Sequence, residues 1–138
     1  GFIKIMFPGI SDFNVFGKYI YIAKRLGTKE DERGNLIPYY DTPKKYYFNV
    51  QPVNSDGELT AFGEIAFQRM KCICSREKYE GVFKDGDLAY LDGANPKGEK
   101  INGEKANYTI KGNPLNQNYV IVIYFERIID KQKIAKEG

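Results

Sequence analysis

The sequence predicts an all-β fold, namely a small antiparallel β-barrel or sandwich with long loops and at most one short helix. Short β-prone runs alternate with turns rich in glycine, proline and aspartate, which is typical of antiparallel sheets. Aromatic residues, all Tyr or Phe, make up 14% of the 138 residues, and such side chains pack well on a pleated sheet. Closure of the sheet would also remove edges at which strands pair at random.

The length corresponds to one domain on size grounds. Three regions are expected: an N-terminal arm over residues 1–14, a β-barrel domain over residues 15–129 and a C-terminal tail over residues 130–138. The arm is apolar, so its aromatic side chains would favour aggregation unless they pack on the domain or on a neighbouring subunit. From Ile128 onward we expect a short amphipathic helix or a frayed end.

The first predicted strand is Val15–Lys24, where the alternation in Tyr19–Ile22 places isoleucines on one face and tyrosines on the other. The charged stretch Thr28–Asn35 is expected to be the loop of a hairpin whose two feet are Leu26 and Leu36.

The returning arm is Ile37–Asp41, and after a break the strand Lys45–Val53 follows. Prolines at positions 38, 43 and 52 favour an edge or bent strand over a central one. Asn54–Gly57 indicates a turn, and apolar residues at helical spacing in Glu58–Ala66 are compatible with a short helical turn.

Two further strands are predicted in the second half of the chain. In Phe67–Ser75, Met70 and the two cysteines alternate with charged residues. Val120–Phe125 is the most hydrophobic run and lacks alternation, so we predict a central strand that is covered on both faces.

Between them lies a turn-rich unit. Phe83–Asp87 should form a tight turn, because Asp-Gly tolerates positive φ, and Leu88–Leu91 should be a short strand. The polar stretch Lys97–Lys105 contains no residue that looks buried, so it is expected to lie in solvent until a strand resumes at Tyr108–Ile110.

The residues with possible chemistry are few. Cys72 and Cys74 would face the same side of a strand, which does not suit a disulfide, and we interpret them as small buried residues. A metal or redox pair is the alternative, although the chain has no histidine. Asp85, Asp87 and Asp92 are interpreted as turn aspartates. A calcium site is the alternative, but their spacing departs from that of the calcium-binding loop.

We predict no catalytic, cofactor-binding or metal-binding residue and no enzymatic activity, because no serine or cysteine has a histidine partner. An enzyme would be indicated by a polar pocket with perturbed carboxylates. The net charge of +3 has both signs interspersed, whereas a dedicated nucleic-acid binder concentrates positive charge. Phe2–Phe7 is apolar but too short for a membrane span and lacks the architecture of a signal peptide, so a cytosolic origin is expected.

Several segments together resemble small virion proteins of long-tailed, siphovirus-like bacteriophages, which are called head-closure, head–tail joining or minor capsid proteins. The likeness lies in the residue pattern of these segments and in their order along the chain, and it covers roughly Val15 to Ile129. The segments that carry it are Tyr46–Pro52, Ala61–Glu64, Phe83–Gly93, Ala106–Ile110 and Val120–Arg127.

The resemblance implies a compact β-barrel that assembles as a homo-oligomeric ring beneath the portal and adaptor proteins at the phage neck. There it would close the DNA-filled head and offer a docking face to the tail. The implied partners are identical subunits, portal or adaptor proteins, tail proteins, and packaged DNA that is contacted sterically without sequence specificity. The implied location is the head–tail interface of the virion, after a monomeric stage in the cytoplasm of the bacterial host.

The arm and two loops are the predicted contact segments of such a ring, with plain solvent exposure as the alternative for each loop. Their residues are Phe2, Phe7 and Phe13 in the arm, Thr28, Lys29, Glu30, Asp31, Glu32 and Arg33 in the first loop, and Lys97, Glu99, Lys100, Glu104 and Lys105 in the second.

Two alternatives remain open. One is another neck or tail ring protein, such as a tail terminator. The other is an oligonucleotide-binding β-barrel, in which tyrosines beside lysines would stack on bases. Packing in the core and on the surface explains the same tyrosines. The residues concerned are Tyr19, Tyr21, Tyr46 and Tyr47, with Lys18, Lys44 and Lys45.

Overall fold

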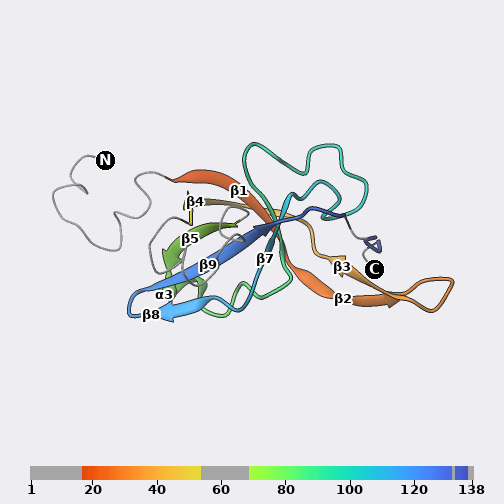
Figure 1. The fold of residues 1–138 in the computed structure, drawn as a ribbon, viewed down its shortest axis with the longest axis horizontal. Coiled ribbons are helices and arrows are strands. Elements are labelled where there is room, and N and C mark those ends of the chain that lie inside the picture. The colour runs from red at the N-terminus through yellow and green to blue at the C-terminus, as the bar shows by residue number, and fades with distance from the viewer. Residues whose placement is uncertain (1–16, 54–68, 132, 137–138) are drawn as a thin grey trace.

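A computed structural model of the chain describes residues 17–53, 69–131 and 133–136. Figure 1 shows a body of short strands from which a hairpin and a long loop extend. The predicted turn Asn54–Gly57 and helical turn Glu58–Ala66 lie outside the described residues. No helix in the described part is long and apolar enough to cross a membrane.

The elements are β1 (Lys18–Ala23), β2 (Arg25–Glu30), β3 (Leu36–Tyr40), β4 (Lys44–Pro52), β5 (Arg69–Ser75), α3 (Arg76–Tyr79), β6 (Leu88–Tyr90), β7 (Tyr108–Ile110), β8 (Leu115–Gln117) and β9 (Val120–Arg127).

Six strands close into an antiparallel barrel. Their order is β5-β4-β1-β6-β7-β9, and the pairing of β5 with β9 completes the cylinder. β8 extends the sheet along β9, because β7 pairs with residues 125–127 of β9 and β8 pairs with residues 120–122. The predicted all-β barrel with at most one short helix is therefore confirmed for the described residues.

Alternation along the strands fills the barrel. Ile20 and Ile22 of β1 are buried, whereas Tyr19 is 66% exposed, as the sequence predicted. On β5, Cys72 and Cys74 are buried free thiols, which confirms their interpretation as small core residues. Burial raises the pKa of the Cys72 thiol well above its ordinary value, so this side chain stays in its unreactive protonated form.

An aromatic cluster anchors α3 and the turn before β6 to the barrel. Phe48 of β4 stacks on Tyr46 at a centroid distance of 5.3 Å and meets Tyr79 of α3 edge-on at 5.0 Å. Phe83 lies 6.0 Å from Phe48 and is, like Phe48, only 2% exposed. Edge-to-face and offset pairs at these distances are favourable beyond the area that they bury.

β9 is the central strand, as its sequence predicted. It pairs with β5 along one edge and with β7 and β8 along the other. Ile121, Ile123 and Phe125 are at most 1% exposed, and Val122 on the opposite face is also buried. The absence of alternation in this run thus reflects cover on both faces.

β4 changes its partner halfway along. Residues 44–48 pair with β1, and residues 49–52 pair with β5. The predicted edge strand is therefore not observed, because β4 lies between β5 and β1. Pro52 occupies the last position of β4, where the missing N–H disturbs the ladder least.

Three features differ from expectation because tertiary contacts decide them. β8 was not predicted; its three residues are exposed and become a strand only by pairing with β9. α3 was not predicted either, and its first turn is capped by Ser75, whose Oγ accepts a hydrogen bond from the Lys78 N–H at 3.4 Å. The expectation of a helical or frayed tail is wrong over the described residues, because Ile134 packs against a buried cluster.

Candidate functional site

The β2–β3 hairpin extends away from the barrel (Figure 1). Within the described residues, β2 and β3 pair only with each other. Leu26 is 48% exposed and Leu36 is 71% exposed. A two-stranded ribbon is marginally stable on its own in water, and exposed apolar side chains on such a ribbon mark a candidate contact surface.

The predicted hairpin loop is shorter than expected. Thr28–Asn35 is not one loop, because β2 continues through Glu30 and pairs it with Leu36. The turn is therefore Asp31–Asn35, and Leu26 is not the partner of Leu36. Charged residues continue this ladder because β2 has no buried residue and so needs no apolar alternation, whereas Ile37 and Tyr40 of β3 are buried.

Asp31 folds the tip of the hairpin. Its carboxylate accepts hydrogen bonds from the backbone N–H groups of Asn35 and Arg33 at 2.8 and 2.9 Å. These bonds, chiefly the one from Asn35, hold the pKa of Asp31 below its usual value. Glu32 and Arg33 are left exposed at the end of the ribbon, with opposite charges side by side.

Glu99 organises the loop between β6 and β7. The Tyr90 hydroxyl donates to both carboxylate oxygens at 2.7 and 2.8 Å, and the N–H groups of Gly103 and Lys105 donate at 3.1 and 2.9 Å. Tyr90 is fully buried, and this burial is the main cause that raises the pKa of its hydroxyl. The neighbouring Glu99 carboxylate raises the same pKa further. The expectation that all of Lys97–Lys105 lies in solvent is therefore wrong: Gly103 is buried, and Glu99 turns inward to satisfy a buried phenol and two amides.

Replacing Tyr90 with phenylalanine should lower the free energy of unfolding by about 1.5–3 kcal/mol, the usual value for a hydrogen bond to a charged group. Removal of the hydroxyl also releases the loop, so the amide protons of Gly103 and Lys105 should exchange faster with solvent. Urea denaturation and hydrogen exchange measure the two effects. Tyr119→Phe is the control, because Tyr119 is 71% exposed; equal effects of both changes would contradict the assigned role of the hydroxyl.

The C-terminal segment joins the loop to the hairpin. The Lys131 ammonium donates to the Glu104 carbonyl at 2.7 Å, and the Ala135 N–H donates to the Pro38 carbonyl of β3 at 2.9 Å. Hairpin, loop and tail therefore meet at one end of the barrel, although they are far apart in the sequence.

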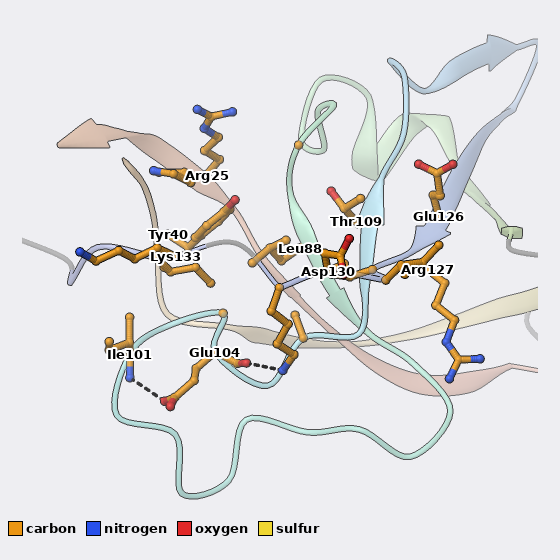
Figure 2. Close-up of a pocket in the computed structure, with 18 of the residues that line it drawn as sticks. Arg25, Tyr40, Leu88, Ile101, Glu104, Thr109, Glu126, Arg127, Asp130 and Lys133 are labelled. Carbon is orange, nitrogen blue, oxygen red and sulfur yellow. Dashed lines mark hydrogen bonds between the residues drawn. The ribbon is translucent and has the colours of Figure 1, made fainter. Parts of the chain in front are cut away.

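Together with residues of β6, β7 and β9, these three segments line a cavity of about 710 Å³ (Figure 2). Charged side chains of both signs contribute to it, among them Arg25, Glu104 and Lys133, so no ligand of a single charge is favoured. Pockets that hold ligands are mostly apolar with a few polar groups; here nine of the nineteen lining residues are apolar and seven are charged. The main apolar residues are Leu36, Pro38, Tyr40, Leu88, Ile101 and Ile134.

Three of the four tyrosines of the oligonucleotide alternative, Tyr19, Tyr21 and Tyr47, lie on the outer face of β1 and β4, whereas Tyr46 faces the core opposite Ile20. Tyr19 and Tyr47 meet edge-on at 4.8 Å, and the Lys45 ammonium lies 4.4 Å from the centre of the Tyr19 ring. Tyr46 belongs to the aromatic cluster, and Tyr21 lies edge-on to another ring. Packing therefore accounts for Tyr46 and Tyr21, whereas Tyr19 and Tyr47 remain 66% and 43% exposed.

The three turn aspartates have separate partners. Asp87 is 2% exposed and accepts hydrogen bonds from the N–H groups of Arg25 and Lys84 at 2.9 and 3.0 Å. Burial nevertheless raises its pKa. Asp85 and Asp92 accept from a loop amide and from a phenol at 2.6 and 3.2 Å. Across the described ranges, no three His, Cys, Asp or Glu residues gather as a metal site.

The predicted contact residues fall into three groups. Within the loops, Lys29 and Lys105 donate to backbone carbonyls at 2.7 and 2.6 Å, while Asp31, Glu99 and Glu104 accept from loop amides. The second group is exposed and comprises Thr28, Glu30, Glu32, Arg33, Lys97 and Lys100. The third group, Phe2, Phe7 and Phe13, lies outside the described residues.

Sequence reasoning missed the apolar lining of the cavity. Leu88, Tyr40 and Ile134 come from β6, β3 and the tail, and only the fold brings them together. The available signal was the apolar pair Leu36-Ile37 directly after a charged turn, of which Leu36 is exposed and Ile37 is buried.

Comparisons with known proteins bear on the fold. No protein-family model and no curated protein matches the chain. Among solved structures, the solution structure of protein SF1141 from Shigella flexneri 2a is similar, with a TM-score of 0.56 and 16% sequence identity over 86% of this chain and 99% of that one. At this level of identity the likeness concerns the barrel architecture alone, because one fold serves many functions.

Proposed function

We propose that the protein is a structural virion protein of the neck of a long-tailed phage, where it forms a ring that closes the DNA-filled head and joins it to the tail. The observation that carries this proposal is the β2–β3 hairpin, which leaves a closed barrel and presents Leu36 with 71% of its surface exposed. The choice of the phage neck as the assembly rests on the resemblance of the sequence to head-closure proteins.

The hairpin suits a contact between identical subunits. Closure of the barrel uses up the long strand edges of the body, whereas the outer edge of β2 has no strand partner among the described residues. A free edge can add a strand from a neighbour through main-chain hydrogen bonds. Contacts of this head-to-tail kind close into a ring when the rotation between subunits allows it.

The charges suit steric closure of a DNA channel. The net charge is only +3, and the exposed tip carries Glu32 beside Arg33. Binding to DNA phosphates requires clustered lysine and arginine and is weakened by salt. A tip with mixed charges can block a channel without holding the DNA that must later pass through it.

Reconstitution of filled heads that lack this protein tests the proposal. Addition of the purified chain should preserve nuclease-protected DNA and allow tails to join, and electron microscopy should show a ring at the neck. Leu36→Asp should abolish this rescue, because it places a charge on the exposed hairpin contact. Leu115→Asp is the matched control, since Leu115 is 50% exposed on β8.

Heads that keep their DNA and join tails equally well without the protein would contradict the proposal. Density at the end of the tail tube rather than below the portal would instead identify a tail terminator. Salt-dependent binding to single-stranded oligonucleotides would favour the oligonucleotide-binding barrel.

A further inference from the structure

We propose that the cavity between the hairpin, the long loop and the tail binds the N-terminal arm, residues 2–13, of a neighbouring copy of this chain. The inference rests on the proposed ring and names the segment and the surface that would join its subunits. Three features carry it: the composition of the arm, the lining of the cavity, and the separation along β1 between the cavity and Gly17, which follows the arm.

The arm and the cavity match in chemistry. Nine of the sixteen residues before Gly17 are Phe, Ile, Met or Val. The cavity offers them Leu36, Tyr40, Ile101 and Ile134, and it has a volume of about 710 Å³. Each apolar side chain that moves from water into such a site favours the complex.

The cavity is held open by the protein itself. The Lys131 ammonium is bonded to the Glu104 carbonyl, and the Glu104 carboxylate accepts from the backbone N–H of Ile101 at 3.4 Å (Figure 2). Ala135 is bonded to β3. A preformed site reduces the ordering that binding would otherwise require.

The cavity lies at one end of β1, and the described chain begins at the other. Ala23 at the end of β1 pairs with Leu88, which lines the cavity, and Arg25 just beyond also lines it. Gly17 precedes the other end of the strand, six residues earlier, which is about 20 Å at the usual strand rise. A donor at one end and an acceptor at the other make a head-to-tail contact, the kind that generates rings.

The arm is long enough to reach a neighbour. Twelve extended residues span at most about 40 Å, which exceeds the length of β1. Docking of the arm would also cover Leu36, the most exposed leucine among the described residues. The docked arm would therefore cover apolar surface that is exposed in the isolated subunit.

Disulfide trapping between full-length chains tests the inference. One chain carries Phe7→Cys and the other Leu36→Cys; the native Cys72 and Cys74 are buried and do not compete. After mild oxidation at the highest soluble concentration, mass spectrometry quantifies the mixed dimer. We expect several-fold more of it than with Leu26→Cys, which is also exposed on the hairpin but does not line the cavity.

Equal trapping at positions 36 and 26, or no trapping at either, would overturn the inference. So would a doubly substituted Phe7→Cys/Leu36→Cys chain that closes its disulfide within a monomer, because the arm would then occupy its own cavity. The assay needs no phage particles, so its failure leaves the ring at the neck to be judged by imaging. Conversely, trapping without density at the neck would refute the proposed function and retain the contact between copies.

Discussion

Replacing Phe48 with alanine is expected to lower the free energy of unfolding by about 3–5 kcal/mol, the usual range for deletion of a buried phenylalanine. Phe48 is 2% exposed and makes ring contacts with Tyr46, Tyr79 and Phe83. The cavity left by its removal cannot collapse easily, because Phe48 itself lies on a strand of the closed barrel. Since domains of this kind are stable by only about 5–15 kcal/mol in total, the variant should unfold at much lower urea concentration.

Tyr47→Ala is the matched control for this change. Tyr47 is the next residue of β4, but it is 43% exposed and its described ring contact is with Tyr19. Loss of one aromatic pair should destabilise the fold by about 0.5–1.5 kcal/mol. If the two variants unfolded at the same urea concentration, the aromatic cluster would not be what anchors α3 and the turn before β6 to the barrel.

Gly103→Ala is expected to destabilise the protein by about 2–4 kcal/mol, the sum of a left-handed backbone and an overpacked contact. Gly103 has a φ of +94°, and a Cβ there would lie 2.6 Å from Leu88 Cδ1 and 3.4 Å from Tyr40 Cδ2. Leu88 is buried and has little room to move. Thermal unfolding measures the loss, and the chemical shifts of Ile134 should change because that side chain shares the contact.

Gly93→Ala separates the two causes. Gly93 has a similar φ of +85°, but a Cβ there meets nothing within 4 Å. This variant should therefore show only the conformational cost, about 1–2 kcal/mol. If Gly103→Ala were no worse than Gly93→Ala, the close packing of the loop against Leu88 would be wrong.

Much of the barrel could be predicted because its strands show their environment locally. Ile20 and Ile22 alternate with tyrosines since one face of β1 meets the core, and the continuous apolar run of β9 reflects burial on both faces. Cys72 and Cys74 follow the same period. In each case the pattern that the sequence shows is the pattern that burial requires.

The site could not be predicted in the same way, because its parts depend on distant partners. Glu99 has the sequence context of a solvated loop, yet Tyr90 draws it inward. Leu115–Gln117 has no strand pattern and owes its conformation to β9. Ile134 of the tail packs beside Tyr40 only once the hairpin is in place. The secondary-structure propensity of a segment does not predict such long-range contacts.

The late position of β9 in the chain also affects how the molecule is made. Cys72 of β5 pairs with Ile123, about fifty residues further along the chain, and the same strand holds β7 and β8. A nascent polypeptide that ends before β9 has nothing to close its cylinder, so folding must await the end of this segment. Pairings between such distant residues form slowly. Until they form, the unpaired strands can pair with other chains and aggregate.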